Sequence, residues 1–218
     1  MVLTAERSYA ASIAVGDWVH FDGSAGTLGG GAFMVDDVTN GAVADFRTFC
    51  VQESRYIDYS HDFRVGSITN HDDDAAGPDP IQTETAWIMS NFSRGLLGAY
   101  SSNDIQWSIW KLEGEQSANW GNSAALINMA QTAVLGGWSN DGVNVLNLFW
   151  ANGAPAQNQL IYVPAVVTTS EVPEPATLVL LGTGLLALVR KRRRERSRSA
   201  PHLSPVAGRH GLQGIVTS

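Results

Sequence analysis

The sequence is poor in the residues and motifs that most enzyme and metal chemistry requires. Cys50 is the one cysteine among 218 residues, so no disulfide can form within the chain. No HExxH, CxxC or paired histidine spacing occurs, which argues against a zinc site. No GxSxG occurs either, and the GGG at 29–31 lacks the Lys-Ser/Thr that follows in a phosphate-binding loop. We therefore expect no metal, no cofactor and no enzymatic activity.

Acidic residues cluster in the segment NHDDDAAGPDP at 70–80, whose composition predicts a polar loop. An EF-hand loop counted from Asp72 would need an oxygen ligand at its fifth position and a bidentate glutamate at its twelfth. Those positions hold Ala76 and Thr83, and Gly77 alone fits. We favour a solvated loop over a calcium site.

Basic residues are scarce in most of the chain and concentrated near its end. Residues 1–171 hold 6 Lys/Arg against 19 Asp/Glu, whereas residues 190–218 hold 8 against 1. The basic cluster abuts an apolar run and has no interleaved aromatic residues. We therefore favour a role in membrane topology and expect no binding to nucleic acid.

The apolar run covers 14 uncharged residues at 176–189. As a helix it would span roughly 21 Å, short of the ~30 Å hydrocarbon core, but extension back to Val172 gives 18 residues. It lacks a polar face, and long basic side chains that follow it can reach the interface. These charges are Arg190, Lys191, Arg192, Arg193 and Arg194. The pattern predicts a membrane helix with the basic side in the cytoplasm and residues 1–171 across the membrane.

The order VPEP, apolar helix and arginine cluster, over about residues 171–196, resembles the PEP-CTERM sorting signal of Gram-negative bacteria. The resemblance implies recognition by an integral-membrane exosortase that acts near the Pro-Glu-Pro motif. It implies an inner-membrane location during sorting, and then the cell surface or the extracellular space. The recognition residues would be Val172, Pro173, Glu174 and Pro175, and the five basic residues from Arg190 to Arg194 would stop transfer.

Two features depart from that family. Its signal usually ends soon after the basic cluster, whereas 24 residues follow Arg194 here. Its members also carry an N-terminal signal peptide, and residues 1–21 show no basic start followed by an apolar core. We expect the true start, with a signal peptide, to lie upstream of Met1.

The rest of the chain is β-rich. Short apolar and alternating runs separated by glycine predict strands within 12–51, and again at 143–150 and 158–164. Helical spacing predicts helices at Thr83–Leu97, with Thr83 or Thr85 as N-cap, Asn103–Leu112 and Ser123–Leu135. The order strands, helices, strands predicts one α+β extracytoplasmic domain at 1–165. A linker with the Pro-Glu-Pro motif at 166–175, the membrane helix at 176–189 and a basic cytoplasmic tail at 190–218 would follow.

Two short motifs, FCVQ at 49–52 and IQWSIW at 105–110, resemble the thioester domains of bacterial surface adhesins. The resemblance implies that Cys50 and Gln106 condense with loss of ammonia into an internal thioester, which an amine-bearing surface ligand then attacks. Trp107 and Trp110 would supply a dry surround. The family usually has a small Ala between the Gln and the Ile-Trp pair, where this sequence has Trp107 and Ser108. The alternative is that Cys50 is a small buried hydrophobe and Gln106 an ordinary helix residue.

A glycan-binding or structural surface module with the same sorting signal is the competing hypothesis. Asp58, Asp62 and Glu53, near Tyr56 and Tyr59, could line a site for a surface polysaccharide. Seven tryptophans also suggest stacking on sugars, although core packing explains most of them more simply. A secreted hydrolase ranks last, because the sequence shows no catalytic set.

Overall fold

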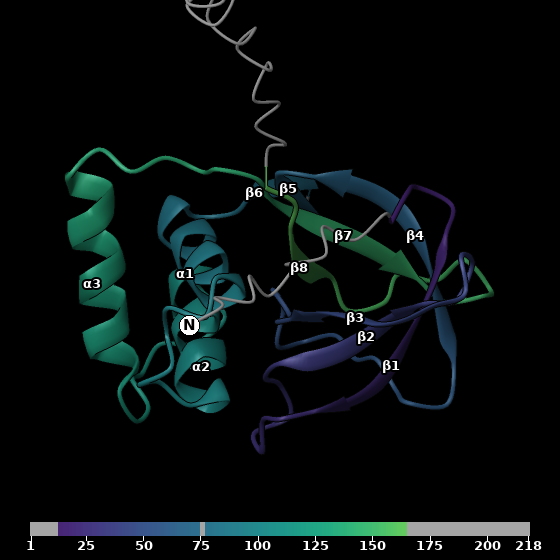
Figure 1. The fold of residues 1–218 in the computed structure, drawn as a ribbon, viewed down its shortest axis with the longest axis horizontal. Coiled ribbons are helices and arrows are strands. Elements are labelled where there is room, and N and C mark those ends of the chain that lie inside the picture. Colours follow the sequence, from purple (N-terminus) through teal and green to yellow (C-terminus); the bar gives the residue numbers. More distant parts are fainter. Residues whose placement is uncertain (1–12, 75–76, 165–218) are drawn as a thin grey trace, which may run out of the picture. The chain divides into compact units, whose positions relative to one another are not determined.

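A computed structural model describes residues 13–74 and 77–164. They belong to the first of two units into which the chain divides, Met1–Val166 and Val167–Ser218. The described residues form a β-rich α+β domain, as predicted (Figure 1). Its elements are β1 (Trp18–Ser24), β2 (Phe33–Asp37), β3 (Ala42–Thr48), β4 (Asp62–Thr69), β5 (His71–Asp74), β6 (Gly77–Pro80), α1 (Thr83–Ser93), α2 (Ser102–Leu112), α3 (Ser123–Leu135), β7 (Val143–Phe149) and β8 (Gln159–Tyr162).

The main sheet is antiparallel and has the strand order β3-β2-β1-β4-β7-β8. Its two edges meet, because the residues that follow β3 pair with β8. The Leu160 N–H donates to the Phe49 carbonyl at 2.9 Å, and the Val51 N–H donates to the Asn158 carbonyl at 3.0 Å. Cys50 lies opposite Gln159 between these two bonds. Closure of the sheet satisfies backbone groups that an open edge would expose.

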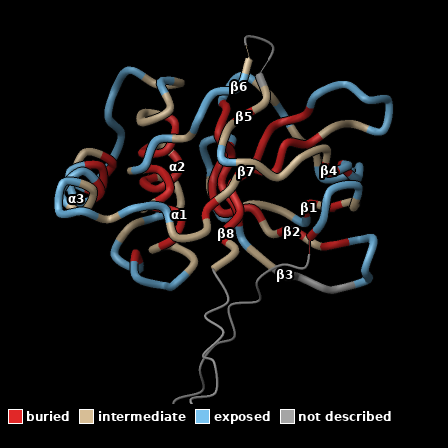
Figure 2. The backbone as a smooth tube through the Cα atoms, turned by 90° about the horizontal axis from the view of Figure 1, so that it is seen from above, coloured by how far each residue is buried: buried red, intermediate tan, exposed pale blue. Residues whose placement is uncertain are grey.

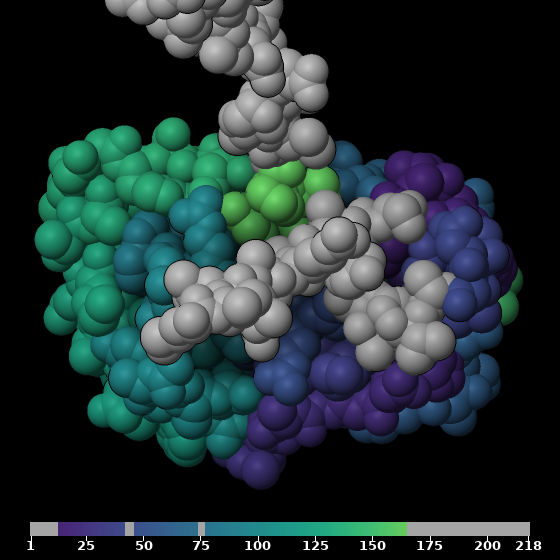
Figure 3. Space-filling model, in the orientation of Figure 1, coloured from purple at the N-terminus to yellow at the C-terminus, as the bar shows by residue number. Residues whose placement is uncertain are grey.

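Strand alternation divides the apolar side chains between two cores. On β8, Leu160 and Tyr162 join the core that faces the helices, whereas Ile161 points into the core enclosed by the curled sheet. The helices α1, α2 and α3 pack on one another, and α1 also packs on β7 and β8. Figure 2 shows buried residues along β7 and β8, between the helices and the remaining strands. In the space-filling view the helical residues, in teal and green, adjoin the strand residues in purple and blue (Figure 3).

The three predicted helices are confirmed, with differences at their ends. α2 begins with a capping box, in which the Ser101 side chain accepts from the Asp104 N–H and Asp104 accepts from the Ser101 N–H. α1 is preceded by Gln82 and has no side-chain cap, so the predicted threonine cap is wrong. α1 also ends at Ser93, before the predicted end at Leu97, and Leu96 beyond it is 65% exposed.

Two strand regions differ from the sequence-based expectation. The acidic segment at 70–80 is a hairpin of β5 and β6, not a loop. Asn147 and Asn158 of the β7–β8 region explain this, because they bond to the Asp73 N–H at 2.8 Å and to the Asp72 carboxylate. β4 was not predicted because Gly66 interrupts it. A Cβ atom there would lie 2.2 Å from the Phe149 ring, so the glycine admits the aromatic side chain.

None of the helices within the described part of the chain combines the length and apolar character needed to cross a bilayer. The predicted membrane helix at 176–189 lies outside the described residues.

Glu113 ends α2 and holds the start of α1. Its Oε1 accepts a hydrogen bond from the Gln82 N–H at 3.1 Å. Burial raises the pKa of its carboxyl group to about 7, and the charges of Asp79 and Asp72 add to the shift. The folded-state pKa therefore lies above the ordinary value of 4.5. Glu113 contributes stability that is fully present below pH 4.5 and is lost as the pH rises through about 7.

We predict that Glu113→Gln stabilises the domain at pH 8 and leaves it unchanged at pH 4. The amide keeps an oxygen for the Gln82 N–H but carries no charge, so the gain at pH 8 should reach at most about 3 kcal/mol. Urea unfolding of both proteins at pH 4, 6 and 8 measures the difference. A difference that does not change with pH would contradict the role assigned to Glu113.

Candidate functional site

Cys50 sits where the sheet closes, directly after β3. Its side chain is fully buried in the core enclosed by the sheet, together with Trp110 and Ile161. The hydrogen bonds on either side of it join residue 49 to 160 and residue 51 to 158. Cys50 and Gln159 thus form a non-hydrogen-bonded pair of the ladder, in which facing side chains lie close together. The backbone of Cys50 has no partner on β8 and is left for another group.

That group is the carboxamide of Gln106, which α2 carries toward the sheet. Gln106 is 1% exposed. Its Nε2 donates to the Cys50 carbonyl at 2.8 Å, and its Oε1 accepts from the Cys50 N–H at 3.2 Å. The Cys50 Sγ lies 3.3 Å from the same Oε1. The structure therefore brings together the two residues that the sequence singled out, 56 positions apart.

These contacts also bound the distance between the two atoms that a thioester would join. A carbonyl bond is about 1.2 Å long, so the Gln106 Cδ lies at most about 4.5 Å from the Cys50 Sγ. The two side chains need only a small movement to bring the sulfur and the carboxamide carbon to the separation of about 3–3.5 Å that precedes bond formation. The Gln106 carboxamide is hydrogen-bonded to the backbone of Cys50, so the relative position of the two side chains depends on main-chain geometry.

Trp110 shares the core of Cys50, and two further tryptophans lie in a row beside it. Trp110, one turn further along α2, is 2% exposed, and its indole N–H is buried without a satisfied hydrogen bond. Trp107 packs edge-on against Trp110, with ring centroids 6.0 Å apart, and donates its N–H to the Ala118 carbonyl at 2.8 Å. The rings of Trp107 and Trp120 are also neighbours, with centroids 6.3 Å apart. The Trp110 indole therefore contributes to the apolar surroundings of the Cys50 thiol.

Burial raises the pKa of the Cys50 thiol far above its ordinary value, and the charges of Glu115 and Glu53 add to this. The two glutamates are joined, because the Glu53 N–H donates to the Glu115 Oε2 at 2.9 Å. The raised pKa favours the thiol over the thiolate, and the neighbouring charges are negative, unlike the electropositive surroundings that activate exposed cysteines.

A glycine-rich segment between β1 and β2, here called the glycine loop (residues 25–32), covers the carboxamide. The Gly31 N–H donates to the Gln106 Oε1 at 3.1 Å. The tip of the loop is tied to α2, because the Thr27 N–H donates to Asn103 Oδ1 at 2.9 Å and Asn103 Nδ2 donates to Thr27 Oγ1 at 2.8 Å. At its base, Ser24 Oγ accepts from the Gly26 N–H and donates to the Gly30 carbonyl, both at 3.0 Å.

The sequence analysis did not assign the glycine loop to this site. The GGG at 29–31 was tested only as a phosphate loop and rejected. A run of glycines also indicates that a backbone must approach another group closely, and that signal could have drawn attention to the loop. Asn103 and Gln159, by contrast, carry no sequence signal, because only the fold brings them next to Gln106 and Cys50.

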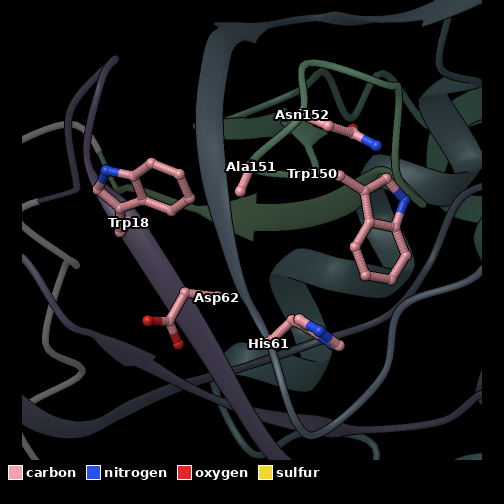
Figure 4. Close-up of a pocket in the computed structure, with 6 residues that line it drawn as sticks. All are labelled: Trp18, His61, Asp62, Trp150, Ala151 and Asn152. Atoms are coloured by element: carbon pink, nitrogen blue, oxygen red, sulfur yellow. The ribbon is translucent and has the colours of Figure 1, made fainter.

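A second feature is a surface pocket of about 540 Å³, which is a typical size for a small-ligand site. It is lined by Trp18, His61, Asp62, Trp150, Ala151 and Asn152. In Figure 4 the two indole rings lie at opposite sides of the close-up, with Asp62 and His61 below them and Asn152 above.

Neighbouring side chains fix the polar groups of this pocket. His20 Nδ1 lies 2.8 Å from the Asp62 carboxylate, and His61 Nδ1 lies 2.8 Å from the Asp58 carboxylate. Trp150 packs edge-on against Phe63, with ring centroids 4.6 Å apart. Of the residues predicted for a sugar site, Asp62 lines the pocket and Asp58 supports it.

The other residues predicted for the sugar site do not line the pocket. Glu53 is joined instead to Glu115, near Cys50. Tyr56 and Tyr59 are 75% and 52% exposed at the surface. Within 13–74 and 77–164, no group of three or more His, Cys, Asp or Glu side chains is arranged to hold a metal ion.

Comparison with known families finds a match for part of the chain. Residues 171–194 match the family described as the PEP-CTERM protein-sorting motif. No curated protein and no solved structure matches the chain. The sorting motif predicted from the order of VPEP, apolar run and basic cluster is therefore confirmed.

The motif implies an exosortase as the processing partner, and membrane-associated sorting of an exported protein toward the cell surface. The residues predicted to carry recognition and to stop transfer lie within or at the end of the matched segment and outside the described part of the structure.

Proposed function

We propose that this protein is an exosortase-sorted surface or extracellular-matrix adhesin of a Gram-negative bacterium, and that Cys50 and Gln106 form an internal thioester. The sorting part rests on the motif at 171–194. The adhesin part rests on one observation, the burial of the Cys50 thiol 3.3 Å from the carboxamide oxygen of Gln106. A thiol and one particular carboxamide carbon, held together in a dry site, are what thioester formation requires.

Thioester formation would proceed in two linked changes. The Cys50 Sγ adds to the Gln106 Cδ, so the S–C bond forms and the carbonyl oxygen gains negative charge. The Cδ–Nε2 bond then breaks, and the thiol proton is transferred to Nε2, which leaves as ammonia. No oxidant or other reactant is needed. The raised pKa of the thiol disfavours a free thiolate, so the fixed geometry has to supply most of the rate.

The thioester would react only once. A primary amine of a surface ligand attacks the thioester carbonyl, an amide bond to Gln106 forms, and Cys50 is released as a thiol. Each molecule reacts once and is not regenerated, so the protein would be a covalent binder and not an enzyme. The acidic pair Glu53 and Glu115, whose charges act on Cys50, would favour a cationic amine such as a lysine side chain.

The competing function is non-covalent binding of a surface polysaccharide. Its support is the pocket between Trp18 and Trp150, where indole faces, the Asp62 carboxylate and the Asn152 amide are combined. Sugars bind to such sites through their apolar faces and their hydroxyl groups. Under this function Gln106 has a structural role, since it satisfies the Cys50 N–H and carbonyl.

The thioester predicts a mass deficit. The freshly purified full chain should weigh about 17 Da less than its sequence mass, because ammonia is lost. Cys50 should resist thiol reagents until methylamine is added, and then become reactive while Gln106 gains the methylamide. Intact-mass spectrometry and peptide mapping measure both changes.

Two variants complete this test. Gln106→Glu keeps the size of the side chain but has no ammonia to lose, and Cys50→Ala removes the thiol. Neither should show the deficit, and Cys50→Ala should cost little stability if reactivity is the main role of the sulfur. Full sequence mass in the native chain, with a buried but unmodified thiol, would eliminate the thioester.

The sorting motif predicts a processing defect. Replacement of Pro173, Glu174 and Pro175 by Ala should leave unprocessed, membrane-bound protein in cells that contain the exosortase, because the recognition residues are gone. Fractionation and immunoblotting measure processing, with Pro164→Ala as a control outside the motif. Normal processing of the triple variant would refute this part of the proposal.

The competing function predicts saturable sugar binding. Polysaccharide extracted from the surface of the host bacterium, and the tetramer of N-acetylglucosamine as a defined probe, should quench tryptophan fluorescence. Trp18→Ala should weaken binding at least tenfold, whereas Tyr56→Ala, outside the pocket and 75% exposed, should not. No binding by the native chain, or equal binding by Trp18→Ala, would remove the glycan site.

A further inference from the structure

The carboxamide oxygen of Gln106 has more donors than a structural role requires. It accepts from the Gly31 N–H at 3.1 Å and from the Cys50 N–H at 3.2 Å, and the Cys50 Sγ lies 3.3 Å away. A carbonyl oxygen has two lone pairs, and one partner is enough to satisfy a buried one. Three donor groups at one oxygen are suited to an atom that acquires negative charge.

The two backbone donors come from unrelated parts of the chain. Cys50 follows β3, and Gly31 lies at the end of the glycine loop just before β2. The loop is fixed at two points, by Ser24 at its base and by the Thr27–Asn103 pair at its tip. Such donors are in place before the reaction, so they would stabilise the developing charge without reorganisation.

We infer that the N–H groups of Gly31 and Cys50 form an oxyanion site for the Gln106 carbonyl. This inference rests on the proposed thioester. The site would act twice, when the Cys50 thiol adds to Cδ and when an amine adds to the thioester carbonyl. In both steps the negative charge of the tetrahedral intermediate lies on the atom that is now Oε1. Loss of one such donor typically slows a reaction about 10²- to 10³-fold.

Gly30, next to the donor Gly31, has to be glycine because the loop backbone is packed against the side chain of Gln106. A Cβ atom at Gly30 would lie 2.7 Å from the Gln106 Cγ and 2.9 Å from the Trp110 ring. Alanine is compatible with the backbone conformation of Gly30, which lacks the positive φ found at its neighbours Gly29 (+80°) and Gly31 (+122°). A substitution at Gly30 therefore displaces Gln106 from its donors without straining φ.

The test compares Gly30→Ala with Gly29→Ala in the full chain. A Cβ atom at Gly29 meets nothing within 4 Å, so that variant strains the same loop but does not touch the carboxamide. The rate of methylamine incorporation, followed by intact mass, should fall at least tenfold in Gly30→Ala and stay within about threefold of the native rate in Gly29→Ala. Thermal unfolding of each variant shows whether it is folded.

A native rate in Gly30→Ala, or equal slowing in both variants, would overturn the oxyanion site while the thioester stands. Absence of the mass deficit in the native chain would overturn the thioester and the oxyanion site with it. A second measurement needs no variant. The carbonyl stretch of a ¹³C-labelled Gln106 thioester should have a lower frequency in the native protein than that of an equally ¹³C-labelled small thioester in aprotic solvent. Equal frequencies would also overturn the inference.

Discussion

The position of Cys50 depends on the side-chain amide of Gln106, which bonds to the backbone of Cys50 as a neighbouring strand would. The curled sheet closes through the bonds of residues 49 and 51 to β8, which leaves the N–H and carbonyl of Cys50 facing α2. Gln106 supplies an acceptor and a donor to these two groups. A buried backbone pair without partners would cost several kcal/mol, about 1–3 for each group, so this pairing joins the helices to the sheet.

The same constraint places the Gln106 carboxamide beside the Cys50 thiol. The oxygen that accepts from the Cys50 N–H is the same atom that lies 3.3 Å from the Cys50 Sγ. The two cores on either side of β8 then fix the strand, the helix and the indoles around them. The resulting site is closed to solvent, because Cys50 is fully buried and Gln106 is 1% exposed.

Much of this could be predicted from the sequence, and the failures have physical causes. The helices α1, α2 and α3 follow from apolar spacing, and the resemblance of two short motifs to thioester domains singled out Cys50 and Gln106, which lie in contact. β4 was missed because Gly66 interrupts its alternation to admit Phe149. The β5–β6 hairpin was missed because its polar residues are satisfied by Asn147 and Asn158, which are distant in sequence. The role of Gly31 depends on a tertiary contact with α2, which no local pattern encodes.

The sorting signal and the folded domain are independent sources of information. The motif at 171–194 tells where the protein is sent, and its match says nothing of what residues 13–164 do there. The account of the domain depends on whether the contact between Cys50 and Gln106 becomes a bond. A high-resolution crystal structure of the native protein, grown without amines, measures this directly. The account predicts continuous electron density from Cys50 Sγ to Gln106 Cδ and no nitrogen at the Cys50 carbonyl. Separate side chains, with Nε2 still donating to that carbonyl, would contradict it.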